Sequence, residues 1–410
     1  MRKILFLSPS YPFGHFGPSD NCTVRIMDAL VRTGRYEVFD ISYRPPKADS
    51  KPNYRTIVGL NLIQLPYSEG LKRRSRTFQK IRAFFRIPIY PLERLISIWK
   101  YYNSCKKIIA DNHFDLVISQ YKPFESVITG SLLKKGGHID KHIVVTWDVI
   151  YGKIHNAIIP HSFALRRQRR VVNWIARYSD KLITLYSQKK FHEENGDVPE
   201  AIGKRHYLGI PSISRPDTRI SPINEEFIDP EKINVIYAGS IYSYNDLDYS
   251  IKLLNASSYA KQVNLILLVK DPVQDSLVKM TEGYKGTIHL SKWVSFEDLY
   301  SLYSQVDIFF AFSGSWALGV PGKTYEYLSF GKPIIHFYEC DNDVNLSVFS
   351  PYPLFKGIDV KLPLEDNIRE IDDFLNMSLT AHVDFEKIEK LFPYATMSSY
   401  LHIIEEEAGK

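Results

Sequence analysis

The sequence predicts an α/β protein of two tandem domains, each built on a doubly wound parallel sheet. Short, continuously apolar segments alternate with helix-like segments along the chain, which is typical of parallel sheets covered on both faces. The length of 410 residues suits two domains of about 200 residues each. A stretch rich in proline and polar residues, 208–230, separates two rounds of this alternation and indicates a linker.

The first round of alternation begins with an apolar strand at the N-terminus. A loop rich in proline, glycine and serine follows, and then a helical stripe that ends near Gly34. Each strand of this half is short, apolar and bounded by polar or turn-forming residues. The expected strands are 3–8, 37–42, 61–65, 115–119, 142–146 and 181–186, and a helix is expected after the fourth, through Leu133.

The second round repeats this plan after the linker. Its first strand ends in a turn, Gly239-Ser240. The expected strands are 233–238, 263–269, 287–290, 307–312 and 333–337, with helices over 246–255, 296–304 and within 367–407. We therefore expect an N-terminal domain over 1–215, a C-terminal domain over 231–390, and a closing helix over 391–410 that could pack back on the first domain.

Composition and cysteine usage limit the class of protein. The chain is 44% hydrophobic and 24% charged, as in ordinary globular proteins. No apolar run approaches the roughly 18 residues of a membrane span, and the N-terminal apolar stretch is too short for a signal peptide. Cys22, Cys105 and Cys340 are far apart and lack metal-ligand spacing, so we expect reduced thiols in a cytoplasmic protein.

The positive charge of the chain is concentrated in one segment. Residues 71–107 hold eleven Lys or Arg and one acid, Glu93, a net charge of +10, so the other residues carry about −4 of the total of +6. Aromatic and aliphatic residues recur there at helical spacing, at Phe78, Ile81, Phe84 and Phe85 and again at Leu92, Leu95, Ile96 and Trp99. Residues 72–107 are therefore a candidate contact with an anionic membrane surface. The alternative is a helix that packs its apolar stripe into the core. Nucleic acid is disfavoured, since no binding module is visible.

The most informative motif is Val320-Pro-Gly-Lys-Thr-Tyr-Glu-Tyr-Leu-Ser-Phe-Gly-Lys-Pro-Ile-Ile335. It predicts a loop, a helix of about two turns that Gly331 ends, and a buried strand. Lys323, Glu326, Tyr327 and Phe330 share one helical face by their spacing. The start of the helix could offer backbone N–H groups to an anion, and Glu326 could accept hydrogen bonds from a sugar diol. Alternatively, Glu326 only stabilises the helix dipole and Lys323 is solvated.

These features resemble the GT-B glycosyltransferases, which have two Rossmann-like domains with a cleft between them. The pattern P-x-K-x-x-E-Y-L-x-x-G-K-P-I-I matches from Pro321 to Ile335, and the segments 179–187, 239–240 and 290–294 also agree with the family's plan. The closest resemblance is to the bacterial nucleotide-sugar branch that makes surface polysaccharides and glycolipids. It covers nearly the whole chain, strongly over 231–340 and loosely over 1–220.

The resemblance implies that the C-terminal domain binds the sugar-nucleotide donor. Glu326 would hold the ribose hydroxyls, while Lys323 and the helix start would face the diphosphate. Gly239 and Ser240 would let the backbone approach the phosphates, and Trp293 and Val294 would lie against the base. Lys270 follows a buried strand and is a second phosphate candidate, or a solvated lysine. The donor-site residues are Gly239, Ser240, Lys270, Trp293, Val294, Lys323, Thr324, Glu326 and Tyr327.

The N-terminal domain would hold the acceptor and supply a base. His15 and Asp20 lie in the long first loop, and Asp148 ends another strand at the carboxyl edge, where such sheets bind ligands. His15 could equally be a surface histidine, and Asp20 could cap the following helix. Two D-x-D tripeptides, Asp246-Leu-Asp248 and Asp341-Asn-Asp343, are common by chance, so we expect no metal and no other cofactor.

The sequence also departs from the family pattern. The acid found in many retaining members before the ribose glutamate is absent at Leu318 and Gly319, and the histidine frequent after the fifth strand of the N-terminal domain is missing from Thr146-Trp147-Asp148. We expect a hexosyltransferase that moves a sugar from a UDP-sugar to a saccharide or lipid-linked saccharide acceptor. A non-catalytic GT-B subunit and a nucleotide-sugar epimerase of the same fold are the alternatives. A dehydrogenase is disfavoured, because neither domain opens with G-x-G-x-x-G.

Overall fold

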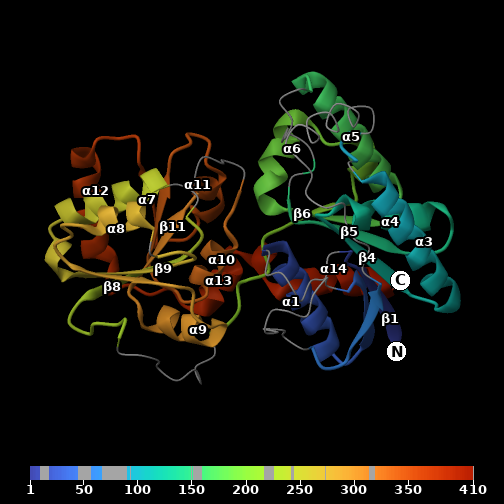
Figure 1. Ribbon diagram of the computed structural model, residues 1–410, viewed down its shortest axis with the longest axis horizontal. Helices are drawn as coiled ribbons and strands as arrows, with labels where there is room; N and C mark the ends of the chain where they lie inside the picture. Colours follow the sequence, from blue (N-terminus) through green and yellow to red (C-terminus); the bar gives the residue numbers. More distant parts are fainter. Residues whose placement is uncertain are drawn as a thin grey trace. The chain divides into compact units, whose positions relative to one another are not determined.

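The structure of this chain is a computed structural model (Figure 1). It describes residues 1–9, 18–44, 57–66, 90–92, 94–148, 150, 159–216, 226–241, 244–272, 274–313 and 319–409. The chain divides into two compact units. Unit 1 consists of Met1–Pro211 and Met397–Lys410, and unit 2 is Ser212–Thr396. Of the predicted features, His15 and the apolar residues Phe78, Ile81, Phe84 and Phe85 lie outside the described residues.

Unit 1 contains a parallel sheet with the strand order β3-β2-β1-β4-β5-β6-β7. Its strands are β1 (Arg2–Leu7), β2 (Tyr36–Tyr43), β3 (Leu60–Leu65), β4 (Leu116–Tyr121), β5 (His142–Thr146), β6 (Lys181–Leu185) and β7 (Arg205–Leu208). The central strands β4 and β5 are buried along their whole length. The order reverses direction between β1 and β4, and ligands of doubly wound sheets bind outside the carboxyl ends of the strands at such a point.

Helices cover both faces of the sheet of unit 1 (Figure 1). They are α1 (Pro18–Arg32), α3 (Leu95–Asp111), α4 (Phe124–Lys135), α5 (His161–Arg177), α6 (Lys189–Asn195) and α14 (Met397–Gly409). On one face α3, α4 and α5 form the core, with Ile98, Val127 and Val172 in one apolar cluster. On the other face α14 packs against α1. The closing helix therefore belongs to unit 1 although it follows unit 2 in the sequence.

Unit 2 contains a parallel sheet with the strand order β10-β9-β8-β11-β12-β13. Its strands are β8 (Ile233–Gly239), β9 (Val263–Val269), β10 (Thr287–Ser291), β11 (Ile308–Phe312), β12 (Ile334–Tyr338) and β13 (Phe355–Asp359). Strands β8 and β11 pair with Val235 opposite Ile308 and Ile236 opposite Phe309. The strand order reverses between these two strands, so the carboxyl ends of β8 and β11 flank the position where a ligand is expected.

The helices of unit 2 also lie on both faces of its sheet. They are α7 (Tyr244–Ala256), α8 (Asp275–Thr281), α9 (Phe296–Gln305), α10 (Gly322–Leu328), α11 (Val344–Phe349), α12 (Leu364–Ser378) and α13 (Phe385–Leu391). Leu254 of α7, Leu277 of α8 and Phe374 of α12 belong to one apolar core with alternate residues of the strands. The opposite face is aromatic, and there Tyr303 of α9 and Tyr327 of α10 contact Phe309 of β11.

The structure confirms the predicted fold class of two doubly wound parallel sheets, and it adds two edge strands that the sequence did not predict. These are β7, Arg-His-Tyr-Leu, and β13, Phe-Lys-Gly-Ile-Asp. Edge strands pair on one side only, so polar residues and a glycine are tolerated there and the apolar signal is weak. Among the described residues, no helix is both long and apolar enough to cross a membrane.

The end of α10 confirms the role predicted for Gly331. Gly331 has a φ of +66°, and its amide donates to the Leu328 carbonyl at 3.0 Å. A Cβ atom at this position would lie 2.3 Å from the Val383 carbonyl oxygen. The sequence therefore needs glycine here both for the left-handed conformation and for the close approach of the 383 backbone.

Replacing Gly331 with alanine should destabilise unit 2 by more than the roughly 1–2 kcal/mol of the left-handed conformation alone, because the Val383 backbone would also have to move. Gly283→Ala is the matched control, since Gly283 has a φ of +75° and a Cβ atom there would have no neighbour within 4 Å. Urea unfolding of both variants checks this, and an equal loss in the two would show that the contact with Val383 contributes nothing.

Candidate functional site

The predicted donor residues gather at the carboxyl edge of the sheet of unit 2. Gly239 ends β8 and Ser240 follows it, while α10 follows β11, the strand that pairs with β8. Lys270 comes directly after β9 and is exposed. All these strands are parallel, so their carboxyl ends share one edge of the sheet. Residues far apart in the sequence are thus placed along a single edge.

Packing against the sheet holds α10 in place. The Tyr327 ring stacks on Phe309 of β11 at 4.3 Å, and Tyr325 contacts Phe349 of α11 at 5.0 Å. Tyr325, Tyr327 and Thr324 are buried, whereas Lys323 and Glu326 are only half-buried. The four residues predicted to share one helical face therefore have different surroundings, because Tyr327 and Phe330 pack into the core. Lys323 and Glu326 are the residues of this face that stay half-buried.

The electrostatics of α10 favour an anion beside Lys323. Burial lowers the pKa of the Lys323 ammonium, and the nearby Glu326 carboxylate opposes this shift. A negatively charged ligand would stabilise the cation further. The Thr324 amide donates to the Pro321 carbonyl at 3.1 Å, so this amide of the first turn is already used within the chain. Of the two features predicted to face a diphosphate, the lysine is therefore the stronger.

The turn after β8 is shaped by a tyrosine. The Tyr237 hydroxyl donates to the Ser240 carbonyl at 2.6 Å, which fixes the direction of the chain after Gly239. A Cβ atom on residue 239 would lie 2.8 Å from this hydroxyl. Glycine thus leaves room for the Tyr237 hydroxyl as well as for any ligand that approaches the backbone.

The two residues predicted to lie against a base follow β10. Trp293 is 54% exposed and Val294 is half-buried, and both precede α9. An exposed tryptophan at a carboxyl edge offers an aromatic face for stacking. The structure thus places the pair at the same edge of the sheet as α10 and leaves the contact with a base as a prediction.

A buried polar network contacts Ser313, which follows β11, and Gly319, which precedes α10, and sequence reasoning missed it. Asp343, the N-cap of α11, lies 3.1 Å from His336 Nε2 and accepts from the Asn345 amide at 2.7 Å. The Asn345 side chain donates to the Gly319 carbonyl at 3.2 Å. Burial alone would raise the pKa of Asp343, but bonds from His336 and Ser313 and the charge of His336 lower it. Ser313 and Gly319 therefore both bond to one polar cluster.

This network also explains the second D-x-D tripeptide. Asp343 serves His336 and Asn345, and Asp341 pairs with Lys361. In the first tripeptide, Asp248 pairs with Lys252 at 2.6 Å. Within the described ranges, no cluster of three or more His, Cys, Asp or Glu residues could hold a metal ion.

At the carboxyl edge of unit 1, Asp148 forms an ion pair. Its carboxylate lies 2.5 Å from the Lys122 ammonium, which follows β4. Asp20 lies in the first turn of α1, which begins at Pro18, so it is not the N-cap that the alternative interpretation required. Lys122 was not among the predicted residues, although it directly follows a fully buried strand, and that position is a usable signal.

A second polar cluster lies between α1, β4 and β5 of unit 1. The Trp147 indole N–H lies 3.1 Å from Thr23 Oγ1 and 3.2 Å from Gln120 Oε1, and Thr23 also bonds to Gln120. The Trp147 ring stacks on Tyr400 of α14 at 5.7 Å, and the Tyr400 hydroxyl donates to the Gly209 carbonyl at 2.8 Å. Trp147 therefore supports the attachment of α14 to the rest of unit 1.

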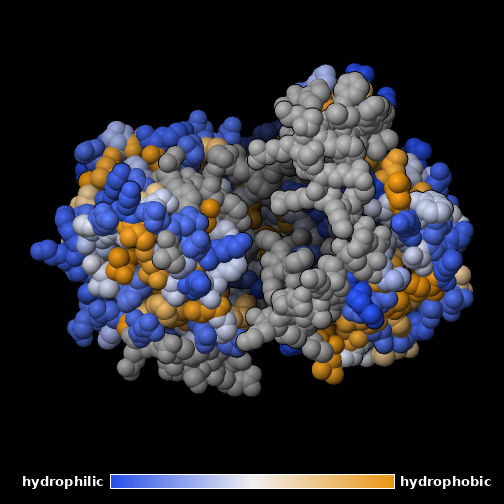
Figure 2. Space-filling view, viewed as in Figure 1, coloured by the Kyte–Doolittle hydropathy of each residue, from blue (hydrophilic) through white to orange (hydrophobic). Residues whose placement is uncertain are grey.

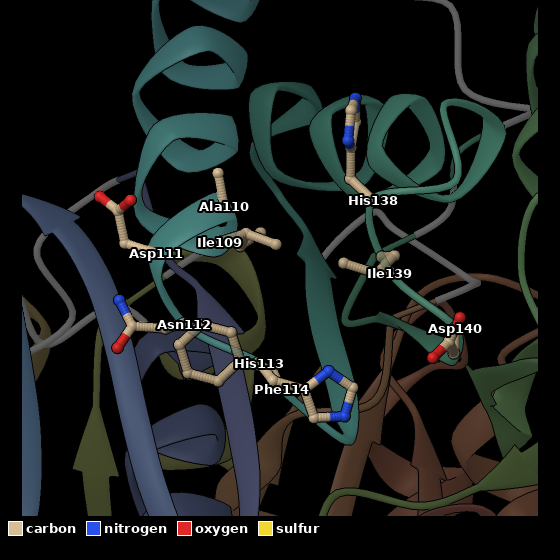
Figure 3. Close-up of a pocket in the computed structure, with 9 residues that line it drawn as sticks. All are labelled: Ile109, Ala110, Asp111, Asn112, His113, Phe114, His138, Ile139 and Asp140. Carbon is tan, nitrogen blue, oxygen red and sulfur yellow. The ribbon is translucent and has the colours of Figure 1, made fainter.

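A cavity of about 250 Å³ in unit 1 lies away from these residues (Figure 3). It is lined by the end of α3 and the turn after α4, including Asp111, His113 and His138. Both segments precede strands, so the cavity is at the amino edge of the sheet. Ligands of doubly wound sheets bind at the opposite edge, so we do not assign the donor or the acceptor to this cavity.

Comparison with solved structures identifies the fold as GT-B. The lipopolysaccharide outer core galactosyltransferase WaaB is similar at a TM-score of 0.58 and 14% identity, over 99% of both chains. An α,α-trehalose-phosphate synthase (UDP-forming) from Burkholderia vietnamiensis is similar at a TM-score of 0.59 and 10% identity, over 100% of this chain and 99% of the other. A UDP-N-acetylglucosamine 2-epimerase is similar at a TM-score of 0.52 and 12% identity, over 99% and 95%. No family model matches the chain, and no curated protein matches its sequence.

Proposed function

We propose that this chain is a glycosyltransferase of the hexosyltransferase type, which transfers a sugar from a UDP-sugar to a saccharide or lipid-linked saccharide in bacterial surface glycan synthesis. The observation that carries the proposal is the position of Lys323 and Glu326. They lie half-buried on a helix that directly follows β11, at the strand-order reversal of unit 2. A cation and a carboxylate one turn apart match the diphosphate and the ribose of a nucleotide sugar.

In this proposal Lys323 stabilises the charge that develops on the leaving diphosphate, while Glu326 orients the nucleotide through its ribose hydroxyls. Gly239 and Ser240 leave space for the phosphates beside β8. Unit 1 supplies the acceptor site, and Asp148 at its carboxyl edge is the candidate base. Its ion pair with Lys122 means that the base must exchange this partner for the acceptor hydroxyl.

Thermal-shift measurements with UDP-, GDP-, ADP- and dTDP-sugars test the donor assignment, because a ligand bound by the native state raises its melting temperature. We expect UDP-sugars to give the largest shift, and the absence of a shift with every nucleotide sugar would overturn the proposal. Release of nucleotide by the purified chain in the presence of a glycan acceptor then tests for transfer.

The similarity to UDP-N-acetylglucosamine 2-epimerase motivates one alternative of the same fold. An epimerase would convert the nucleotide sugar without any acceptor, whereas a transferase would leave it largely intact until acceptor is added. Analysis of the nucleotide sugar after incubation with the chain alone therefore separates the two functions. A chain that binds donor but neither converts nor transfers it would match a non-catalytic subunit.

We expect the proposed reaction to proceed without a divalent cation. In both D-x-D tripeptides at least one carboxylate is bonded to another side chain, Asp248 to Lys252 and Asp343 to His336 and Asn345. Treatment with EDTA followed by assay in chelated buffer should leave the donor-induced thermal shift unchanged. The rate should stay within about twofold of that of the untreated protein, a difference of less than about 0.5 kcal/mol in the activation free energy. A rate that returns only when Mg²⁺ or Mn²⁺ is added back would contradict this expectation.

A further inference from the structure

The beginning of α3 exposes a group of large apolar side chains. Ile96 is 74% exposed and Trp99 is 66% exposed, and Leu95 beside them is also exposed. The helix buries a different stripe, composed of Ile98, Tyr101, Cys105 and Ile109. The predicted apolar residues at the start of this helix thus point away from the core, and the interpretation in which they pack into it is wrong for Ile96 and Trp99.

The beginning of α5 carries cations that sequence reasoning did not single out. This helix, His161–Arg177, contains five arginines and no acid. Arg166 and Arg170 are exposed, and the Arg167 guanidinium lies 5.3 Å from the centre of the partly exposed Phe163 ring. In the part of the chain that the structure describes, neither Arg166 nor Arg170 forms a salt bridge, whereas Arg177 pairs with Glu200 at 2.9 Å.

The two helix starts are joined within unit 1. Tyr90, which precedes α3, packs against Ile159 and Ala164, and Gln168 of α5 donates to the Tyr90 hydroxyl at 2.6 Å. Ile98 of α3 shares a core cluster with Val172 of α5. Both helices precede strands of one parallel sheet, so both begin at its carboxyl edge. The α3–α5 surface is defined by Leu95, Ile96, Trp99, Lys100, Phe163, Arg166, Arg167 and Arg170.

The composition of the α3–α5 surface matches a lipid bilayer. Of the eight residues that define it, Lys100, Arg166, Arg167 and Arg170 are cations and the other four are apolar. In Figure 2, hydrophobic side chains reach the surface in the region where Figure 1 draws α3, α4 and α5. Tryptophan and aliphatic side chains flanked by arginine suit the interface between headgroups and acyl chains. A nucleic acid would use the cations but would leave Leu95 and Ile96 without a role.

We propose that the α3–α5 surface docks this chain on a bilayer with anionic headgroups. Ile96 and Trp99 enter the headgroup region, while Arg166 and Arg170 bind lipid phosphates. The surface lies at the carboxyl edge of unit 1, the edge that also carries Asp148, so docking brings a lipid-borne acceptor near the candidate base. Docking itself goes beyond the proposed function and does not require that function to be correct.

The test is sedimentation of the full chain with vesicles of phosphatidylcholine, with and without phosphatidylglycerol. We expect partition onto the anionic vesicles, and release by salt. Arg166→Gln combined with Arg170→Gln should weaken this partition by about 25-fold, since each cation contributes about fivefold. Ile96→Ser combined with Trp99→Ser should weaken it at least tenfold. The matched control is Ile202→Ser, because Ile202 is 72% exposed and precedes β7, at the amino edge of the same sheet.

Three outcomes would overturn the docking proposal. The first is a wild-type chain that stays in the supernatant with anionic vesicles at low salt. The second is an Ile202→Ser variant that binds as weakly as the variant with Ile96→Ser and Trp99→Ser. The third is vesicle binding that an RNA oligonucleotide abolishes but that the variant with Ile96→Ser and Trp99→Ser retains. The substituted side chains are exposed, so circular dichroism should show unchanged folding. Donor-induced thermal shifts should persist in every variant, which keeps a failure of docking distinct from a failure of the proposed function.

Discussion

Replacement of Glu326 with alanine is expected to abolish the thermal shift that a nucleotide sugar induces. In the proposed complex the carboxylate accepts hydrogen bonds from two ribose hydroxyls. The alanine variant lacks these two charge-assisted bonds of about 1.5–3 kcal/mol each, so its affinity for the nucleotide sugar should fall about 100-fold or more. The fold should be unaffected, because α10 is held by Tyr325 and Tyr327 rather than by the half-buried Glu326. Titration of the UDP-sugar by calorimetry measures the change.

Two further variants make this result specific. Glu326→Gln keeps the shape and one acceptor oxygen, so its loss of affinity should fall between those of the wild type and the alanine variant. Glu282→Ala removes an exposed glutamate that follows α8 and precedes β10, at the amino edge of the same sheet, and should bind normally. An unchanged affinity in Glu326→Ala would remove the ribose assignment.

The second large effect is expected at Asp40, whose replacement with asparagine should change how the stability of unit 1 depends on pH. Asp40 lies in β2 and is completely buried. Burial raises the pKa of its carboxyl group from 3.8 to about 7, although the neighbouring hydroxyls of Ser8 and Ser42 oppose the shift. The folded state therefore binds the proton more tightly than the unfolded state does.

The sign of the pH dependence follows from this difference in proton binding. Below the unfolded pKa the carboxyl group is neutral in both states, and its contribution to stability is fully present. Above the unfolded pKa the unfolded chain has lost the proton, whereas the folded chain keeps it until the pH passes about 7. The free energy of unfolding that this group contributes therefore falls as pH rises toward and through the folded pKa. At 1.36 kcal/mol for each pKa unit, the wild type should lose about 2–3 kcal/mol relative to Asp40→Asn between about pH 5 and pH 8.

The comparison with Asp40→Asn is needed because buried histidines act in the opposite direction. Burial lowers the pKa values of His142 and His192 to about 4, so their contributions are lost as pH falls below the unfolded value of 6.5. Both histidines are present in the wild type and in the variant, and their effects cancel in the difference. Urea unfolding of the two proteins at several pH values measures this difference, with Asp111→Asn as an exposed control. Parallel stability curves for wild type and Asp40→Asn would refute the prediction.

Local pattern predicted much of unit 2 because its elements carry strong and separate signals. The strand 263–269 is apolar except for Asn264 and is found with the same bounds. The helix α10 begins at Gly322, directly after Pro321, and the left-handed Gly331 lies in the turn that follows its last residue, Leu328. The exceptions are informative. The edge strand β13, Phe-Lys-Gly-Ile-Asp, mixes polar and apolar residues and contains a glycine, so its strand signal is weak. Asp343 belongs to a polar network whose members come together only when β11, β12 and α11 are packed.

In unit 1 the sequence identified elements more reliably than it identified partners. Asp148 was predicted as a strand-end acid, but its ion pair with Lys122 depends on the adjacency of β4 and β5. The apolar spacing that begins at Leu92 predicted a helix, yet the face that α3 buries is a neighbouring one. Periodicity shows that a stripe exists, and only packing against α4 and the sheet selects which stripe is covered.

The sequence by itself determined the two-sheet plan, the strands that are buried on both faces, and the helix that carries Lys323 and Glu326. These follow from short-range chemistry, because apolar runs, prolines and left-handed glycines act on their own neighbourhoods. Only the tertiary structure decided the strand orders, the attachment of α14 through Tyr400, the burial of Asp40, and the exposure of Ile96 and Trp99. These depend on contacts between segments far apart in the chain, where many pairings satisfy the same local pattern and the common core selects one of them.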